Sequence, residues 1–301
     1  MLLDRATGSY ERVPIKTFVQ DPMSGAPYFP FLLDMSEDTR YLSLYRDRIQ
    51  GRYSGITYNI YDRLENKAIH VTKGIDSRTV RHNADRPNIS SDGRYVAFSS
   101  SARGVVDGSF RGLYLFDRVT GKYSWVSKRN GQPMRYSGDG ASHSPVISED
   151  GGVVAFASMS FTIVPNMKNI FQGQFEDEWG LYHRAQHVFV RDRHDAATET
   201  VTGNLADTNF PFGSRPGFMS AGGRYITFLG ERGSRANQRG GYYDRATGIL
   251  ERVFSESSRE PPITPVLPPF DAQERWFVFA TKSEELVAAS ENNGDLYCRL
   301  F

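Results

Sequence analysis

Short apolar runs alternate with polar turns along the chain, and two patterns recur. The first pattern is a polar turn followed by an apolar run, and it is clearest at 87–98 (PNISSDGRYVAF) and 145–156 (PVISEDGGVVAF). Apolar runs of this length between turn residues predict β-strands, with Asp92-Gly93 as a hairpin turn. No long apolar pattern at helical spacing is present, which argues against an α/β fold. Further copies of the pattern lie at 216–228, 31–44 and 269–279.

The second pattern is an Asp-Arg pair, a turn and a strand that ends in Val. The Asp and the Val are nine residues apart in every copy, a coincidence that is hard to obtain by chance. The copies run from Asp to Val at 4–13, 62–71, 117–126, 192–201 and 244–253. A residue repeated in every unit is expected to serve the unit. An Asp side chain can bond the backbone of its own turn, and an Arg side chain can span to a neighbouring strand. We therefore predict a structural role for the Asp-Arg pairs.

Together the two patterns define a repeat of four short strands. Alignment on Ser36, Ser90, Ser148, Ser220 and Asp271 gives periods of 54, 58, 72 and 51 residues, near or above the ~40–50 residues of a propeller blade. Strand A is the Pro-led segment, strand B the apolar run, strand C the run into Asp-Arg, and strand D the run ending at Val. One such sheet cannot bury both faces alone, whereas sheets packed around an axis can. We predict an all-β fold, a β-propeller of four-stranded antiparallel blades. Five blades are favoured, with six blades or part of a longer propeller as alternatives.

A single propeller domain is expected to fill residues 1–301. The C-terminal run resembles a strand C, so the last blade (about 265–301) is expected to be closed by the N-terminal strand (about 2–13). Residues 1–4 partly duplicate a strand C, which keeps a sixth incomplete blade or a trimmed longer chain open. Residues 161–186 have no clear strand pattern and are expected to form a loop inserted in the third blade.

Composition narrows the classes of partner. The chain has 301 residues and a formal net charge of +1, which argues against a nucleic-acid-binding protein. No run of 18 apolar residues is present, so no membrane span is predicted. The single cysteine, Cys298, excludes an intramolecular disulfide and a cysteine-cluster zinc site. P-loop and Gly-x-Ser-x-Gly signatures are absent from the sequence, and we expect a monomer without a cofactor.

The repeat resembles a known family. Residues 90–99 (SSDGRYVAFS) and 113–121 (LYLFDRVTG) look like the bacterial WD40-like (PD40) repeat of TolB-type β-propellers, and 283–297 is similar to its B–C connection. The resemblance implies a propeller, often exported, that binds proteins or ligands or accompanies a catalytic domain, and it implies no catalytic residue. It therefore implies a periplasmic or secreted location. Met1 leads directly into a repeat, which would suit a cytoplasmic protein if the chain is complete.

Binding residues are expected where the blades differ. In a propeller the D–A and B–C connections emerge on one face around the opening of the central channel, which we call the channel mouth. Several basic groups there would suit a carboxylate, a phosphate or an acidic sugar, and the alternative is a set of solvated loop residues. The polar residues expected at the channel mouth are Tyr28, Arg81, His82, Asp85, Arg86, His143 and Arg215.

The segment 161–186 is the second candidate. Its aromatic residues Phe175 and Trp179 could stack on a sugar or cover the channel, or they could seal the third blade against the fourth. His183 and His187 are four residues apart. On a strand this spacing separates them by about 13 Å, too far for one ion, so no metal site is predicted.

Two functions remain open from the sequence. The first is a non-catalytic binding propeller that recognises a protein segment or an anionic or glycan ligand at the channel mouth. The alternative is a hydrolase or lyase that acts on a carbohydrate or another anionic small molecule in the same channel, with Asp85 or His143 as acid or base.

Overall fold

The molecule is built from strands and turns. The computed structural model describes residues 2–3, 7–11, 31–50, 53–72, 75, 87–106, 109–128, 142–160, 163–164, 174–176, 182–184, 186–202, 214–230, 239–252, 264–270, 276–280 and 296–300. This part of the chain holds 23 strands and no helix, in agreement with the predicted all-β class. It accordingly contains no helix that could cross a membrane.

Four antiparallel four-stranded sheets make up most of the described structure, and each pairs its strands in chain order. We call them blades one to four. Blade one contains β3 (Phe31–Met35), β4 (Tyr41–Gln50), β5 (Tyr53–Asp62) and β6 (Lys67–His70). Blade two contains β7 (Asn88–Ile89), β8 (Tyr95–Arg103), β9 (Phe110–Asp117) and β10 (Lys122–Trp125). Blade three contains β11 (Ser142–Ile147), β12 (Val153–Ser158), β15 (His187–Asp192) and β16 (Ala197–Thr200). Blade four contains β17 (Ser214–Met219), β18 (Tyr225–Gly230), β19 (Arg239–Asp244) and β20 (Ile249–Arg252).

Three smaller sheets complete the described strands. A three-stranded sheet contains β21 (Thr264–Phe270), β22 (Trp276–Ala280) and β23 (Leu296–Leu300). The first hairpin pairs β1 (Leu2–Leu3) with β2 (Tyr10–Glu11), and a second hairpin pairs β13 (Gln174–Glu176) with β14 (Tyr182–Arg184). The second hairpin gives the segment 161–186 strand structure that its sequence did not suggest. The count of five blades and the closure of the last blade by residues 2–13 stay predictions.

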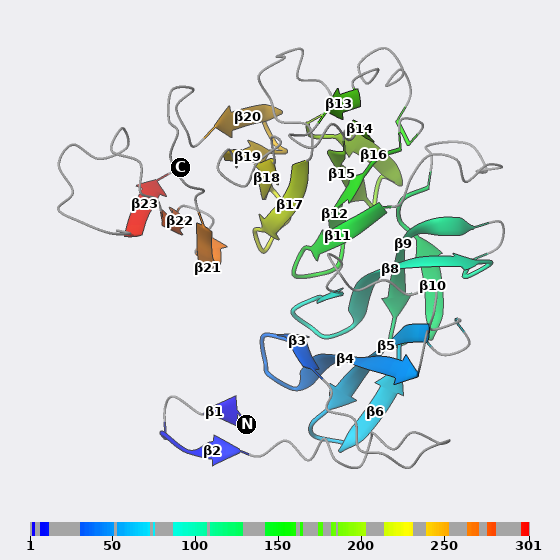
Figure 1. Ribbon diagram of the computed structural model, residues 1–301. Helices are drawn as coiled ribbons and strands as arrows, with labels where there is room; N and C mark the ends of the chain where they lie inside the picture. Colours follow the sequence, from blue (N-terminus) through cyan, green and yellow to red (C-terminus); the bar gives the residue numbers. More distant parts are fainter. Residues whose placement is uncertain are drawn as a thin grey trace.

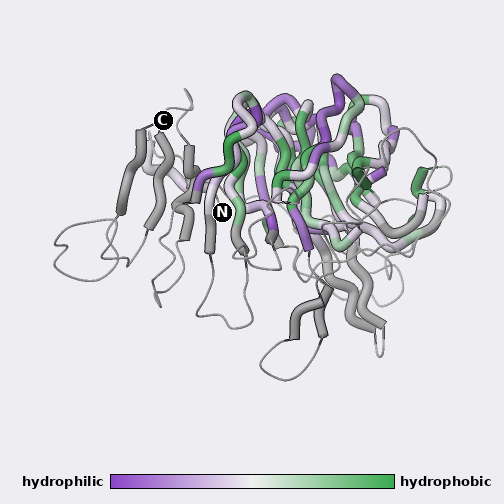
Figure 2. The backbone as a smooth tube through the Cα atoms, turned by 90° about the horizontal axis from the view of Figure 1, so that it is seen from above, coloured by the Kyte–Doolittle hydropathy of each residue, from purple (hydrophilic) through white to green (hydrophobic). Residues whose placement is uncertain are grey.

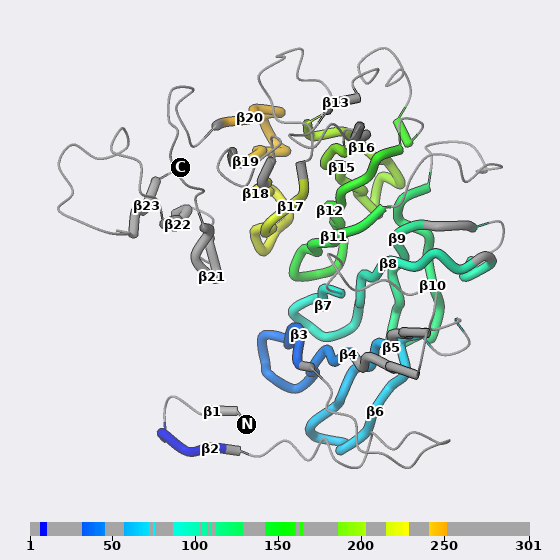
Figure 3. The backbone as a smooth tube through the Cα atoms, in the orientation of Figure 1, coloured from blue at the N-terminus to red at the C-terminus, as the bar shows by residue number. Residues whose placement is uncertain are grey.

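The sheets follow one another around a common centre, with β3, β11, β17 and β21 on the inside of the arc in Figure 1 and β7 between β3 and β11 in Figure 3. The inner strands of successive blades touch: β3 contacts β7, β7 contacts β11, and β11 contacts β17. Figure 3 follows the described backbone from blade one to blade four in this order. The predicted strands A are therefore the innermost strands, as expected for propeller blades.

The hydrophobic core lies between neighbouring blades rather than within one sheet. Between blades one and two, Ile60 and Val71 pack with Val96 and Phe98, all essentially inaccessible to solvent. Separate clusters fill the spaces between blades two and three and between blades three and four. Apolar stretches run along the strands, and polar stretches gather at the turns at one edge of the molecule (Figure 2). Each blade therefore depends on its neighbours to bury its faces.

The A–B turn is fastened by a serine that recurs in all four blades. In blade two, Ser90 Oγ donates to Asp92 Oδ1 (2.6 Å) and accepts from the Tyr95 N–H (2.9 Å). Gly93 closes this turn with a φ of 67°, in the left-handed region that favours glycine. Equivalent serine bonds to the strand B backbone occur at Ser36, Ser148 and Ser220.

The C–D turn carries the predicted Asp-Arg pair. In blade two, Asp117 Oδ1 accepts from the Val119 N–H at 2.9 Å, and Arg118 Nε donates to the Gly93 carbonyl at 2.9 Å. The Arg118 guanidinium also lies 3.9 Å from the centre of the Tyr41 ring in blade one. In blade two the pair thus holds its own turn and reaches the preceding blade. The Asp of blades one, three and four likewise accepts from its own turn backbone, which confirms the structural role of the pair in the described copies.

A further arginine pairs with the Asp of that turn. Arg94 places Nε and Nη2 on the two carboxylate oxygens of Asp117 at 3.1 and 2.9 Å, and this bond lowers the pKa of Asp117 to about 2. Arg94 immediately precedes strand B and Asp117 ends strand C, so the bond joins the two turns at the same end of the blade. The same bidentate bond joins Arg40 to Asp62 and Arg224 to Asp244.

A glycine substitution tests the contact between blades. Gly93 and Gly121 both have a positive φ, but a Cβ at Gly93 would overlap the Tyr41 ring of blade one, whereas a Cβ at Gly121 would meet open space. Gly121→Ala is expected to cost about 1–2 kcal/mol of stability from backbone strain, and Gly93→Ala about 1–3 kcal/mol more from overpacking. Urea unfolding of the two variants measures the difference. Equal losses would contradict the contact.

Acid titration tests the Arg94–Asp117 bond. The pKa of Asp117 falls from its ordinary value of 3.8 to about 2 in the fold, so the stabilisation is complete above about pH 4 and is lost as the pH falls towards 2. Asp117→Asn is expected to lower stability by roughly 2 kcal/mol at pH 7, with a difference from wild type that shrinks below about pH 4. Asp195→Asn, an exposed change in the turn of blade three, is the control. A pH-independent loss in Asp117→Asn would contradict the prediction.

Candidate functional site

The structure places two of the predicted site residues with their side chains, His143 and Arg215. Phe175 lies in β13, where its backbone pairs with His183 of β14. The other predicted site residues lie outside the described residues, namely Tyr28, Arg81, His82, Asp85, Arg86 and Trp179. Their part in a site stays a prediction.

His143 and Arg215 occupy the same position in neighbouring blades. His143 is the second residue of β11 and pairs with Ala157, and Arg215 is the second residue of β17 and pairs with Leu229. Each lies five residues before the serine of its A–B turn, at the opposite end of the strand. Since β11 and β17 are in contact, the two positions lie on neighbouring inner strands. Counting back from Ser90 in the same way reaches Asp85.

The His143 ring is held by two side chains. Its Nε2 lies 2.8 Å from Oε1 of Gln186, and its Nδ1 lies 3.0 Å from Oγ of Ser144. All three side chains are partly exposed. Ser144 stands beside His143 in the sequence, but Gln186 is 43 residues away and meets it only because β12 pairs with both β11 and β15. Sequence reasoning missed both partners.

Two further polar features lie near this end of blade three, a buried pair of serine hydroxyls and the half-buried His187. The hydroxyls of Ser142 and Ser158 hydrogen-bond at 3.0 Å between β11 and β12. His187 begins β15, as its predicted strand position required, and burial lowers its pKa to about 3, so its ring is neutral at physiological pH. Among the described residues no group of three or more His, Cys, Asp or Glu side chains is placed to hold a metal ion.

A polar ladder links the inner strands closer to the A–B turns. Asp34 Oδ2 accepts from Asn88 Nδ2 at 2.7 Å and from the Ile89 N–H at 3.1 Å. Asn88 Oδ1 in turn accepts from the Ile147 N–H at 2.8 Å. Burial raises the pKa of Asp34, although these hydrogen bonds oppose the rise. The ladder joins the inner strands of blades one, two and three through the side chains of Asp34 and Asn88.

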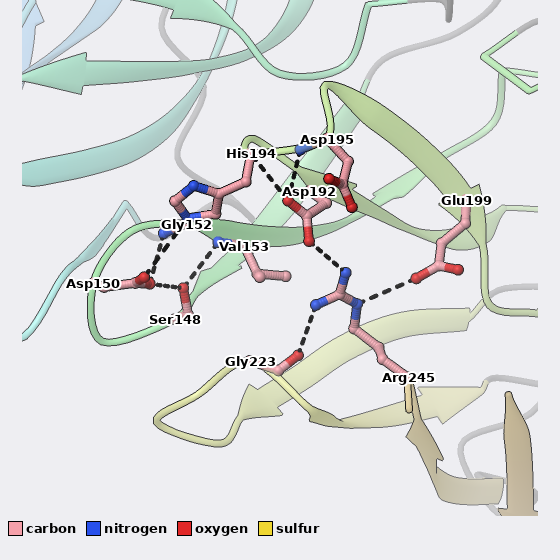
Figure 4. Close-up of polar contacts among 10 residues, drawn as sticks. All are labelled: Ser148, Asp150, Gly152, Val153, Asp192, His194, Asp195, Glu199, Gly223 and Arg245. Atoms are coloured by element: carbon pink, nitrogen blue, oxygen red, sulfur yellow. Dashed lines mark hydrogen bonds and ion pairs between the residues drawn. The ribbon is translucent and has the colours of Figure 1, made fainter. Parts of the chain in front are cut away.

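The turn end of blade three departs from the repeat (Figure 4). Gly152 stands where the other three blades have the arginine that pairs with the C–D Asp, and Val153 stands where they have tyrosine. The side chains of His194 and Asp150 lie beside Gly152, 3.9 Å apart and largely exposed. Asp192 therefore has no arginine partner from its own strand B.

Arg245 of blade four supplies the arginine partner of Asp192 instead. Its Nη2 donates to Asp192 Oδ2 at 2.8 Å and its Nε to Glu199 at 3.2 Å, while Nη1 lies 3.3 Å from the Gly223 carbonyl (Figure 4). Burial opposes ionisation of Asp192, but hydrogen bonds from Arg245 and from the turn backbone outweigh it and lower its pKa. Where the preceding blade offers tyrosine, the corresponding arginines lie over the ring instead. The turn end thus serves blade-to-blade contact, and the opposite end, at His143 and Arg215, is the candidate site.

Removing Arg245 tests this exchange of partners. Arg245→Ala is expected to lower the free energy of unfolding by about 2 kcal/mol, because the carboxylate of Asp192 loses its cation in a largely buried place. Gly152→Arg in the same chain is expected to recover part of the loss, since the side chains that would have to move aside are exposed. Urea unfolding measures both variants. A double variant no more stable than Arg245→Ala would contradict the exchange.

Comparison with known proteins identifies the fold. The structure is similar to the β-propeller domain of the trilobed protease from Pyrococcus furiosus, with a TM-score of 0.50 and 12% identity over 90% of this chain and 69% of that one. It is also similar to an oligogalacturonate lyase solved in complex with manganese, with a TM-score of 0.54 and 12% identity over 99% of this chain and 70% of that one.

TolB from Acinetobacter baumannii also matches, with a TM-score of 0.47 and 17% identity. The match covers 92% of this chain and 53% of that one, so the chain spans about half the length of that TolB protein. No protein-family model and no curated protein matches the sequence. The protease propeller is thus among the structural neighbours, and the four sheets are propeller blades.

Proposed function

We propose that the protein is a binding propeller that holds an anionic ligand at the channel mouth. The observation that carries the proposal is the contrast between the two ends of the blades. The turn end repeats the Ser–Asp bond of the A–B turn in blades one to three and the Arg–Asp bond in blades one, two and four. The other end offers different polar side chains at one equivalent position, His143 in blade three and Arg215 in blade four.

The chemistry of these side chains favours a carboxylate. An arginine guanidinium binds carboxylates through two parallel hydrogen bonds. The lyase among the structural neighbours is named for an acidic sugar polymer. We therefore take an acidic glycan as the first ligand class and an acidic protein segment as the second. A five-bladed ring, with β21–β23 as strands A to C of the last blade, would surround such a ligand.

A catalytic role at the same place is the second candidate. His143 is fixed in orientation by Gln186 and Ser144, as a general acid or base must be. In this reading the protein is a hydrolase or lyase, with Asp85 at the equivalent position of blade two as a possible partner group.

Arg215 provides the test of anion binding. With trigalacturonate as the probe in isothermal titration calorimetry, Arg215→Ala is expected to weaken binding about tenfold or more, as for the loss of one charged hydrogen bond. Lys122→Ala removes the same charge from an exposed position in β10, the outermost strand of blade two, and is expected to leave binding unchanged. Maltotriose, which is neutral, should not bind.

The result also separates the ligand classes. Binding of a glutamate-rich peptide but not of trigalacturonate, with the same dependence on Arg215, would select the protein segment. Release of shortened or unsaturated products from trigalacturonate would select the enzyme. Binding that is equal in wild type and Arg215→Ala would overturn the proposed site.

A further inference from the structure

Ser144, His143 and Gln186 form a chain of three side chains at the channel end of blade three. Ser144 Oγ lies 3.0 Å from His143 Nδ1, and His143 Nε2 lies 2.8 Å from Gln186 Oε1. A hydroxyl, an imidazole in contact with it and a third group that orients the imidazole are the parts of an activated nucleophile. The anion-binding proposal makes no use of Ser144.

The hydrogen bonds fix where the protons lie. The Gln186 amide oxygen can only accept, so His143 must carry its proton on Nε2. In the neutral ring Nδ1 then has a free lone pair, and the Ser144 hydroxyl must donate to it. This is the protonation state in which a histidine can take a proton from serine.

The backbone at Ser144 is held in an unfavourable conformation. Its φ is 51°, in the left-handed region, and Pro145 follows, although a residue before proline normally adopts extended backbone. The pairing of β11 with β12 shifts register directly after His143, between that residue and Val146. Strain of this kind in a residue other than glycine is concentrated at functional sites. Neighbouring side chains of a regular strand point to opposite faces. Because the shift in register interrupts this alternation, the Ser144 hydroxyl can contact the His143 ring.

We propose that Ser144 is a nucleophile for acyl transfer, with His143 as its general base and Gln186 as a positioning residue. Ser144 Oγ would attack the carbonyl carbon of a carboxylic ester while its proton passes to His143 Nδ1. The ester C–O bond then breaks, the alcohol leaves with that proton, and the acyl group stays on Ser144. Water attacks the acyl-serine with His143 again as the base, which releases the carboxylic acid and restores the hydroxyl.

The inference goes beyond the proposed binding function, because an activated serine reacts whether or not Arg215 holds an anion. Gln186 orients the ring but adds no negative charge to stabilise the imidazolium. We therefore expect a slow enzyme that prefers activated or small esters and is detected best by its covalent intermediate.

A fluorophosphonate probe tests the nucleophile directly. Intact-mass spectrometry of the wild-type chain is expected to show one phosphonyl adduct, and peptide mapping is expected to place it on Ser144. Ser144→Gly should abolish the adduct and raise the thermal midpoint by about 2–4 °C, because glycine relieves the backbone strain. Ser142→Ala, next to the site but with a buried hydroxyl bonded to Ser158, is the matched control and should label like wild type.

The roles of the other two residues have separate readouts. His143→Gln is expected to slow labelling about 100-fold or more, as for the loss of a general base. Gln186→Leu removes the acceptor for His143 Nε2 and should slow labelling. Gln186→Glu keeps an acceptor and should label like wild type. The pH profile of labelling in Gln186→Glu should shift upwards, because a carboxylate stabilises the imidazolium. A p-nitrophenyl butyrate burst that requires Ser144 would report the acyl intermediate.

Absence of an adduct from Ser144 in the wild-type chain, or equal labelling of Ser144→Gly, would overturn the inference. The wild-type map decides even if a variant fails to fold. If trigalacturonate binds through Arg215 but the fluorophosphonate never labels Ser144, the binding proposal stands and the proposed nucleophile is wrong. If Ser144 is labelled but trigalacturonate does not bind, the nucleophile proposal stands and the binding proposal is wrong.

Discussion

Burial of apolar sheet faces between neighbouring blades is the constraint on which the rest of the structure depends. A single four-stranded sheet of this size leaves two apolar faces open to water, and the core clusters of this protein lie between sheets. The backbone adds a chain of hydrogen bonds from turn to turn at the inner edge. The Glu37 N–H donates to the Ser91 carbonyl, the Ser91 N–H to the Glu149 carbonyl, and the Glu149 N–H to the Ala221 carbonyl. Adjacent blades are thus fixed in angle and in height.

The contacts between blades lie at the turn end, the end with the A–B and C–D turns, and this explains why the residues at the other end vary. The turn end carries the contacts that set blade against blade, so its residues repeat and are paired within hydrogen-bond distance. The opposite end of strand A instead carries different side chains at one register position, His143 in blade three and Arg215 in blade four. A stable scaffold can also support the unfavourable backbone at Ser144, whose cost the rest of the fold offsets.

The strands and the Asp-Arg turns were predictable because each follows from a local and repeated pattern. The strands A to D of the four described blades lie where the two motifs place them, and Asp117 binds its own turn as expected. Contacts between distant residues were not predictable in this way. The Arg94–Asp117 bond spans 23 residues and the His143–Gln186 bond spans 43, and both exist only once the strands pair. Ser144 stood beside a predicted site residue, but its left-handed backbone conformation has no signature in a serine side chain.

The replacement of an arginine by Gly152 in blade three, with Arg245 supplied from blade four, has a consequence for how this chain could have changed over time. Units that satisfy their own charges can be duplicated, deleted or reordered one by one. The third and fourth units depend on each other, because an inserted or lost copy between them would separate the half-buried Asp192 carboxylate from Arg245. Unless an arginine returns at position 152, these two units are expected to be inherited together, and a circular permutation that opened the chain between them would have to keep them side by side.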